Sequence, residues 1–82
     1  MSDKILKFSA EWCQPCKTLA KTMASLDLGV PVEEIDIDQN DQLAAEYKIR
    51  GVPTLILIRD GKEVARTSGT KTADQLKQFA AG

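Results

Sequence analysis

The feature of this sequence that most constrains its fold is the alternation of strand-type and helix-type segments along the chain. Lys4–Ser9 is short and mostly apolar, as strands are. From Cys16 onward, apolar residues recur at the i, i+3, i+4, i+7, i+8 spacing of an amphipathic helix. Val32–Ile37 then alternates polar and apolar residues, and Asp38–Asp41 offers N-caps for a short helix through about Tyr47. This alternation predicts an α/β domain.

Proline and glycine set the expected limits of the first helix. Pro15 fits only the first turn of a helix, where its missing N–H group is not needed. The helix should therefore begin at about Cys13 or Gln14. Gly29 and Pro31 are expected to end it.

The second half of the chain reads as a hairpin followed by a helix. Thr54–Arg59 is a continuous β-prone run, typical of a central strand that is covered on both faces. Asp60-Gly61 predicts a tight turn that returns the chain through Glu63–Ser68 as an antiparallel strand. A last helix should start at Thr72, and its buried residues are expected to be Ala73, Leu76, Phe79 and Ala80.

The expected order of elements is therefore βαβαββα, with a four-stranded mixed sheet flanked by three helices. The 82 residues are expected to form a single domain, because independent cores are rare below roughly 100 residues.

Composition excludes several classes of function. Eleven Lys and Arg against twelve Asp and Glu give a net charge of −1, so we expect no nucleic-acid partner. The longest aliphatic run, Leu55–Ile58, is far short of the roughly 20 residues of a membrane span, and no signal peptide is visible. The chain is expected to be cytoplasmic. Its other charges, including Glu11, Lys17, Arg59 and Lys62, are expected to lie on a solvated surface.

The chain has no histidine, which excludes histidine-activated nucleophiles and histidine-ligated metals. The only two cysteines stand at Cys13 and Cys16, at the junction of a strand and a helix N-terminus. The unpaired N–H groups and positive dipole there stabilise a thiolate, so we expect a lowered pKa for Cys13. One helical turn also brings the two Cα atoms within the roughly 7 Å that a disulfide requires. The pair can therefore form and break a disulfide.

Two other interpretations of this pair are less favoured. A zinc site needs four ligands, and without further Cys or any His the chain could complete one only through carboxylates or a second copy, so no metal is expected. A purely structural disulfide would constrain the unfolded chain little, because its loop is so short.

The sequence resembles the thioredoxin family over almost its whole length. The resemblance rests on Trp12-Cys13-Gln14-Pro15-Cys16-Lys17 after a strand and on Gly51-Val52-Pro53-Thr54 before another. It is supported by the segments Ile35–Asn40 and Gln75–Phe79, whereas the N-terminal strand and helix of the family are missing. The resemblance implies a trimmed thioredoxin-like fold.

The resemblance also implies roles for individual residues. Cys13 would be the exposed nucleophile and Cys16 the resolving thiol. Pro53 would follow a cis peptide bond, although an ordinary trans proline entering a strand is the alternative. Val52 would offer its backbone to an extended substrate segment.

Two further residues have both a binding and a structural interpretation. Trp12 would form an apolar rim for a partner protein, or it is simply part of the core. Gly69 resembles the glycine of the family's peptide groove, or it is a plain turn glycine.

The sequence departs from the family pattern at three positions. Gln14 stands where the family commonly has glycine, so we expect a redox potential that differs from the family's, in a direction that the sequence does not give. Lys7 aligns with the family's buried aspartate and Glu34 with the lysine beside it, so the charges are exchanged. We expect these two to be candidates for proton transfer at Cys16 through a cross-strand ion pair. The alternative is that Lys7 extends to solvent and Glu34 is a surface acid.

The expected function is that of a general protein disulfide reductant that cycles between a dithiol and a disulfide. The resemblance implies a monomer with no bound cofactor, reduced by NADPH through a thioredoxin reductase, with partners such as ribonucleotide reductase. A glutaredoxin-like protein that works with glutathione is one alternative. A thioredoxin-fold binding subunit that needs no redox chemistry is another.

Overall fold

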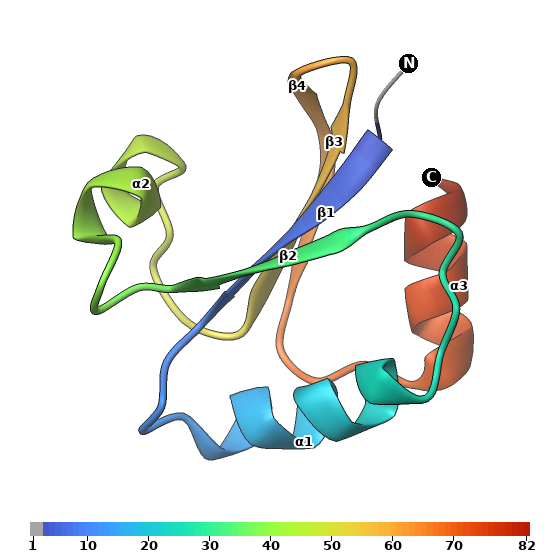
Figure 1. Cartoon of the computed structure of the whole chain (residues 1–82), viewed down its shortest axis with the longest axis horizontal. Helices are drawn as coiled ribbons and strands as arrows, with labels where there is room; N and C mark the ends of the chain where they lie inside the picture. Colours follow the sequence, from blue (N-terminus) through green and yellow to red (C-terminus); the bar gives the residue numbers. More distant parts are fainter. Residues whose placement is uncertain (1–2) are drawn as a thin grey trace.

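The computed structural model describes residues 3–82 and contains four strands and three helices in the predicted order. The strands are β1 (Asp3–Ser9), β2 (Val32–Asp36), β3 (Thr54–Arg59) and β4 (Lys62–Ser68), and the helices are α1 (Gln14–Ala24), α2 (Asp41–Glu46) and α3 (Ala73–Ala81). The sheet has the order β2-β1-β3-β4. Only β1 and β2 are parallel, and β3 is antiparallel to both of its neighbours. The mixed sheet predicted from the sequence is confirmed (Figure 1).

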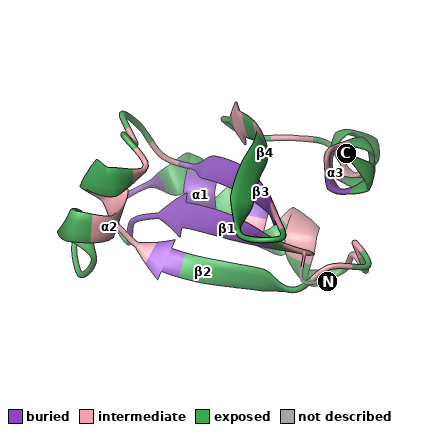
Figure 2. Ribbon diagram, turned by 90° about the horizontal axis from the view of Figure 1, so that it is seen from above, coloured by how far each residue is buried: buried purple, intermediate pink, exposed green. Residues whose placement is uncertain are grey.

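The two inner strands separate two apolar clusters. Side chains of alternate residues point to opposite faces of a strand, so β1 and β3 each contribute to both. On one face, Ile5 and Leu57 pack with Leu19 of α1 and Leu76 of α3. The cluster on the other face consists of Leu6, Phe8, Ile35, Ile56 and Ile58, with Leu43, Ala44 and Tyr47 of α2 packed against it. Figure 2 shows β1 and β3 buried and most of β2 and β4 exposed.

The predicted end of the first helix is wrong. The helix begins at Gln14 as expected, but it ends at Ala24 and does not continue to Gly29. Ser25 is its C-cap, and the Asp27 carboxylate accepts a hydrogen bond from the N–H group of Gly29 in a turn. Short polar side chains of this kind compete with helical hydrogen bonds. The apolar spacing typical of a helix runs only from Cys16 to Ala24, and the apolar residues beyond it pack against the core without being helical.

Other predicted limits differ by no more than one residue. The second strand ends at Asp36, one residue before Ile37. The turn between β3 and β4 is at Asp60-Gly61 as predicted, and both residues have positive φ. Thr72 caps α3 through a capping box with Gln75.

Arg59 is not the solvated surface charge that the sequence analysis expects. Its guanidinium pairs with the Asp3 carboxylate at 3.1 Å and donates to the carbonyl oxygens of Ala80, Ala81 and Gly82. These carbonyls are at the C-terminal end of α3, where helical acceptors have no partners within the helix. Arg59 therefore joins β1, β3 and α3.

Leu19 connects α1 to the sheet, and its replacement should loosen the helix that carries the cysteines. We predict that Leu19→Ala lowers the free energy of unfolding by about 2–5 kcal/mol, because it leaves a cavity in a buried cluster. Thr18→Ala, at an exposed position of the same helix, should change it by no more than about 0.5 kcal/mol. Urea unfolding of both variants measures the change in the free energy of unfolding. Equal changes would contradict the role of Leu19 in packing α1 on the sheet.

Candidate functional site

The two cysteines lie at the N-terminal end of α1 and are joined as a disulfide. Cys13 is the N-cap residue, and its Sγ accepts a hydrogen bond from the backbone N–H of Cys16 at 3.1 Å. The two Cα atoms are 5.3 Å apart. A sulfur at this position receives one of the N–H groups that the first turn leaves unpaired. The same N–H group stabilises negative charge on Cys13 Sγ when the bond is opened.

Cys13 is less exposed than the resemblance implies. It is 4% exposed, as is Cys16. Its Sγ is bonded to Cys16, and the carbonyl oxygen of Val52 lies 3.6 Å from it on another side. A disulfide sulfur carries no proton, so this is a contact, whereas the thiol of the reduced form can donate to that oxygen. The expectation of an exposed nucleophile is therefore wrong for the oxidised protein.

Pro53 and Gly69 are joined to each other, and Val52, the residue before Pro53, contacts Cys13. The Val52–Pro53 peptide bond is cis, as the resemblance implies. The Gly69 N–H donates to the Pro53 carbonyl oxygen at 3.0 Å, which ties the end of β4 to this segment. Gly69 has a φ of +83°, a conformation that favours glycine, so the turn interpretation is sufficient to explain it. Its role in binding a peptide stays a prediction.

Trp12 lies on the surface and not in the core. It is 68% exposed, and its indole Nε1 donates to the Asp38 carboxylate at 2.9 Å. The family resemblance implies this hydrogen bond, but Asp38 is left out of the predicted site because capping of the short helix is the simpler interpretation of its sequence position. The structure assigns that N-cap to Asn40, so Asp38 is available to orient Trp12. The rim interpretation of Trp12 fits this exposure.

Lys7 and Glu34 form the expected cross-strand pair. They are direct neighbours in the parallel register of β1 and β2, and Lys7 Nζ lies 3.2 Å from Glu34 Oε1. The Lys7 side chain is 6% exposed, so it does not extend to solvent, whereas that of Glu34 is 61% exposed. A buried ammonium needs such a partner, because an unpaired charge in the interior is costly.

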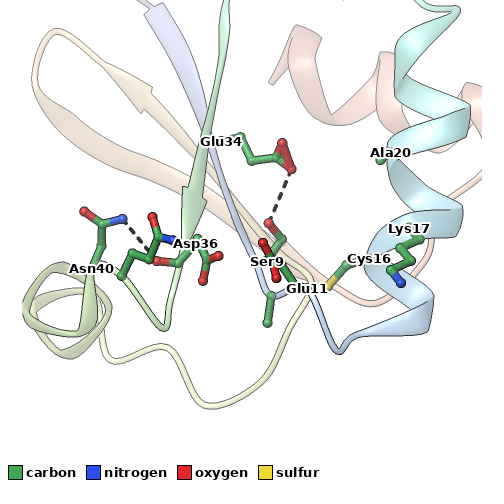
Figure 3. Close-up of a pocket in the computed structure, with 10 residues that line it drawn as sticks. Ser9, Glu11, Cys16, Lys17, Ala20, Glu34, Asp36 and Asn40 are labelled. Atoms are coloured by element: carbon green, nitrogen blue, oxygen red, sulfur yellow. Dashed lines mark hydrogen bonds between the residues drawn. The ribbon is translucent and has the colours of Figure 1, made fainter.

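A cavity of about 520 Å³ lies between Glu34 and the start of α1. Cys16 and Lys17 line one side, and Ser9, Glu34 and Asp36 line the other (Figure 3). The Ser9 hydroxyl donates to Glu34 Oε1 at 3.4 Å. Ser9 is not among the site residues predicted from the sequence, although its position two residues after Lys7 puts it on the same strand face. Cys16 therefore shares a hollow with a carboxylate.

Residues 3–82 contain no cluster of three or more Cys, Asp or Glu side chains arranged to hold a metal ion. No helix in that range is long and apolar enough to cross a membrane.

Comparisons with known proteins agree with the geometry of the site. The family model described as Thioredoxin matches residues 1–82. The chain belongs to the thioredoxin family. It is similar to the thioredoxin of Chlamydia trachomatis, with 41% identity over 75 residues that cover 88% of this chain and 74% of the relative. The mitochondrial thioredoxin of Mus musculus is 38% identical over 79 residues, covering 92% of this chain and 48% of the relative.

The solved structure of Fasciola hepatica thioredoxin superposes on this chain with a TM-score of 0.88 at 34% identity, covering 98% of this chain and 79% of the other. Thioredoxin membership and the disulfide at the helix N-terminus together support a thiol–disulfide oxidoreductase.

The N-terminal end of α1 should make the two thiols of the reduced protein differ in reactivity. We predict that iodoacetamide at pH 7 alkylates Cys13 about tenfold faster than Cys16, because the Cys16 N–H group stabilises the Cys13 thiolate. Peptide mass spectrometry over time measures both rates. Cys16→Ser keeps this N–H group and is the control in which Cys13 should react within about threefold of its original rate. Faster alkylation of Cys16 would contradict the assignment.

Proposed function

We propose that the protein is a general reductant of protein disulfides. The observation that carries the proposal is the Cys13–Cys16 disulfide at the α1 N-terminus, with Val52 and the cis Pro53 beside it. Of the two sulfurs, Cys13 Sγ accepts the Cys16 N–H group and is adjacent in sequence to the exposed Trp12. These features favour Cys13 as the nucleophile and Trp12, Val52, Pro53 and Gly69 as the surface that receives the substrate.

The reaction consists of two thiol–disulfide exchanges. The Cys13 thiolate attacks one sulfur of a partner disulfide, forming a mixed disulfide and releasing the other partner sulfur as a thiolate. The Cys16 thiolate then attacks Cys13 Sγ, which restores the intramolecular disulfide and releases the second partner sulfur. The partner disulfide gains two electrons and becomes two thiols, while Cys13 and Cys16 lose two electrons.

The proposal includes a supply of electrons from outside the chain. A thioredoxin reductase drawing on NADPH would return the disulfide to the dithiol, so the protein itself needs no bound cofactor. Disulfide-containing proteins such as ribonucleotide reductase are the proposed substrates, and the protein acts as a cytoplasmic monomer. The bacterial relatives support this placement, whereas the mitochondrial and chloroplastic names among the relatives show that the family occurs in other compartments.

Reduction of insulin disulfides tests the proposed reaction. With NADPH and a thioredoxin reductase, the protein should accelerate NADPH consumption, and the Cys13→Ser/Cys16→Ser variant should have no effect. A parallel assay replaces the reductase with glutathione and glutathione reductase. Activity only in the glutathione assay would contradict the proposal and favour a glutaredoxin-like function. Partner binding without reduction in either assay would favour a redox-independent subunit.

We further propose that Glu34 accepts the proton of Cys16 during the second exchange, directly or through a water in the cavity they share. Lys7 would favour the Cys16 thiolate by its positive charge and would hold Glu34 beside the cavity. Ser9 would orient the same carboxylate through its hydroxyl. In this arrangement the base lies on β2 and the buried cation on β1.

The second exchange can be measured by isolating a mixed disulfide between Cys13 and a small thiol and following its collapse. Glu34→Gln should slow this collapse about tenfold near pH 7, because a positioned base is lost and water replaces it only in part. The two rates should converge at high pH, where Cys16 ionises without a base. Glu33→Gln removes the adjacent exposed carboxylate, which pairs with Lys4, and is the matched control. Equal rates for Glu34→Gln and the original protein at every pH would exclude Glu34.

A further inference from the structure

Three cations line a second hollow, of about 380 Å³, which is bordered by Gly51 and Thr54, the residues that flank Val52 and Pro53. Lys48 and Arg50 come from the segment between α2 and β3, and Arg66 comes from β4. Ser68, two residues after Arg66 on the same face of β4, also lines the hollow. Its lining residues, which all belong to the described part of the chain, include no carboxylate. The hollow therefore presents hydrogen-bond donors and positive charge to a bound group.

The charges of this hollow are only partly balanced within the protein. The Arg66 guanidinium makes two hydrogen bonds with the Glu63 carboxylate, at 2.7 and 2.8 Å, and these hydrogen bonds lower the pKa of Glu63. Between residues 3 and 82, no carboxylate lies within ion-pair distance of Lys48 or Arg50. Two exposed cations in the same hollow create a positive potential that attracts an anionic group.

The opposite side of the disulfide carries the opposite charge. The cavity beside Cys16 is lined by the carboxylates of Glu11, Glu34 and Asp36 and by one cation, Lys17, while Glu34 also pairs with the buried Lys7. Gly51, which lines the basic hollow, precedes Val52, whose carbonyl oxygen is 3.6 Å from Cys13 Sγ. A segment that crosses the disulfide therefore has carboxylates on one side and cations on the other.

We propose that the hollow formed by Lys48, Arg50 and Arg66 binds an acidic segment of the partner protein, next to the partner's reacting cysteine. This inference rests on the proposed reductase function, because the partner is the protein whose disulfide is reduced. Charge complementarity at exposed sites acts mainly on the rate of association and on the choice of partner. Each such ion pair contributes little, so the effect is a preference among substrates and not a requirement.

The test uses a short peptide disulfide prepared in matched versions, with two Glu, two Gln or two Lys residues on one side of the reacting cysteine. Both orders, before and after the cysteine, are prepared. In one order, the Glu peptide should be reduced about 3–10-fold faster than the Lys peptide at low salt, and in the other order the Lys peptide should be faster. At 0.5 M salt both preferences should fall below about twofold, because salt screens exposed charges.

Variants test whether the preference for Glu peptides over Lys peptides arises from the basic hollow. Lys48→Glu/Arg50→Glu should reverse the preference for Glu over Lys in the favoured order. Lys62→Glu/Lys77→Glu makes the same change in net charge at exposed positions away from the hollow and should leave it within about twofold. Glu63→Gln removes the partner of Arg66 and should strengthen the preference, which provides a second reading if the double variant folds poorly.

The outcomes separate the two proposals. If no peptide is reduced, the proposed reductase function fails, and this inference fails with it. If all peptides are reduced at equal rates in both orders, the reductase function stands and the basic hollow is not a binding site. An equal effect of the control pair would also overturn the inference, because it would assign the preference to net charge alone.

Discussion

The hydrogen bond from the Cys16 N–H group to Cys13 Sγ is the contact on which the proposed chemistry depends. It exists because Cys13 is the N-cap of α1, so its sulfur takes the place that a serine or aspartate oxygen takes at other helix starts. Leu19, buried between α1 and the inner strands, keeps that helix end in place. The rest of the structure therefore holds one helix N-terminus beside the Val52–Pro53 segment.

The sheet supplies the second part of the site. β1 and β2 are parallel neighbours, so Lys7 and Glu34 are in direct register, and both lie on the face that carries α1. Pairing with Glu34 is what permits a lysine side chain to be 6% exposed there. Because Glu34 is itself largely exposed, it stays in contact with water while it lines the cavity beside Cys16. In the proposed proton transfer, the exposure of Glu34 would let it release the Cys16 proton to solvent while Lys7 stays buried.

Most helices and strands could be predicted from the sequence, because the spacing of apolar residues and the positions of turn and cap residues determine local structure. Three local signals correctly placed α1, the β3–β4 turn and α3: the apolar spacing from Cys16, the Asp60-Gly61 pair and the Thr72 cap. The apolar spacing from Cys16 ends at Ala24, where α1 ends, but Gly29 and Pro31 suggested a later end because the Ser25 cap and the Asp27 turn were not recognised. Cys13 is buried against Val52, and Trp12 forms a hydrogen bond with Asp38. Both contacts are between segments distant in sequence, so they depend on tertiary packing that residue spacing does not specify.

The central claim is that Cys13 exchanges disulfides with another protein and that Cys16 completes the exchange. Its most direct test is to mix the reduced Cys16→Ser variant with a protein that carries an accessible disulfide, and to analyse the products by non-reducing electrophoresis and mass spectrometry. The account predicts a stable mixed disulfide through Cys13, because no thiol remains to resolve it. Failure of this variant to form the adduct, or its formation only by Cys13→Ser through Cys16, would contradict the account.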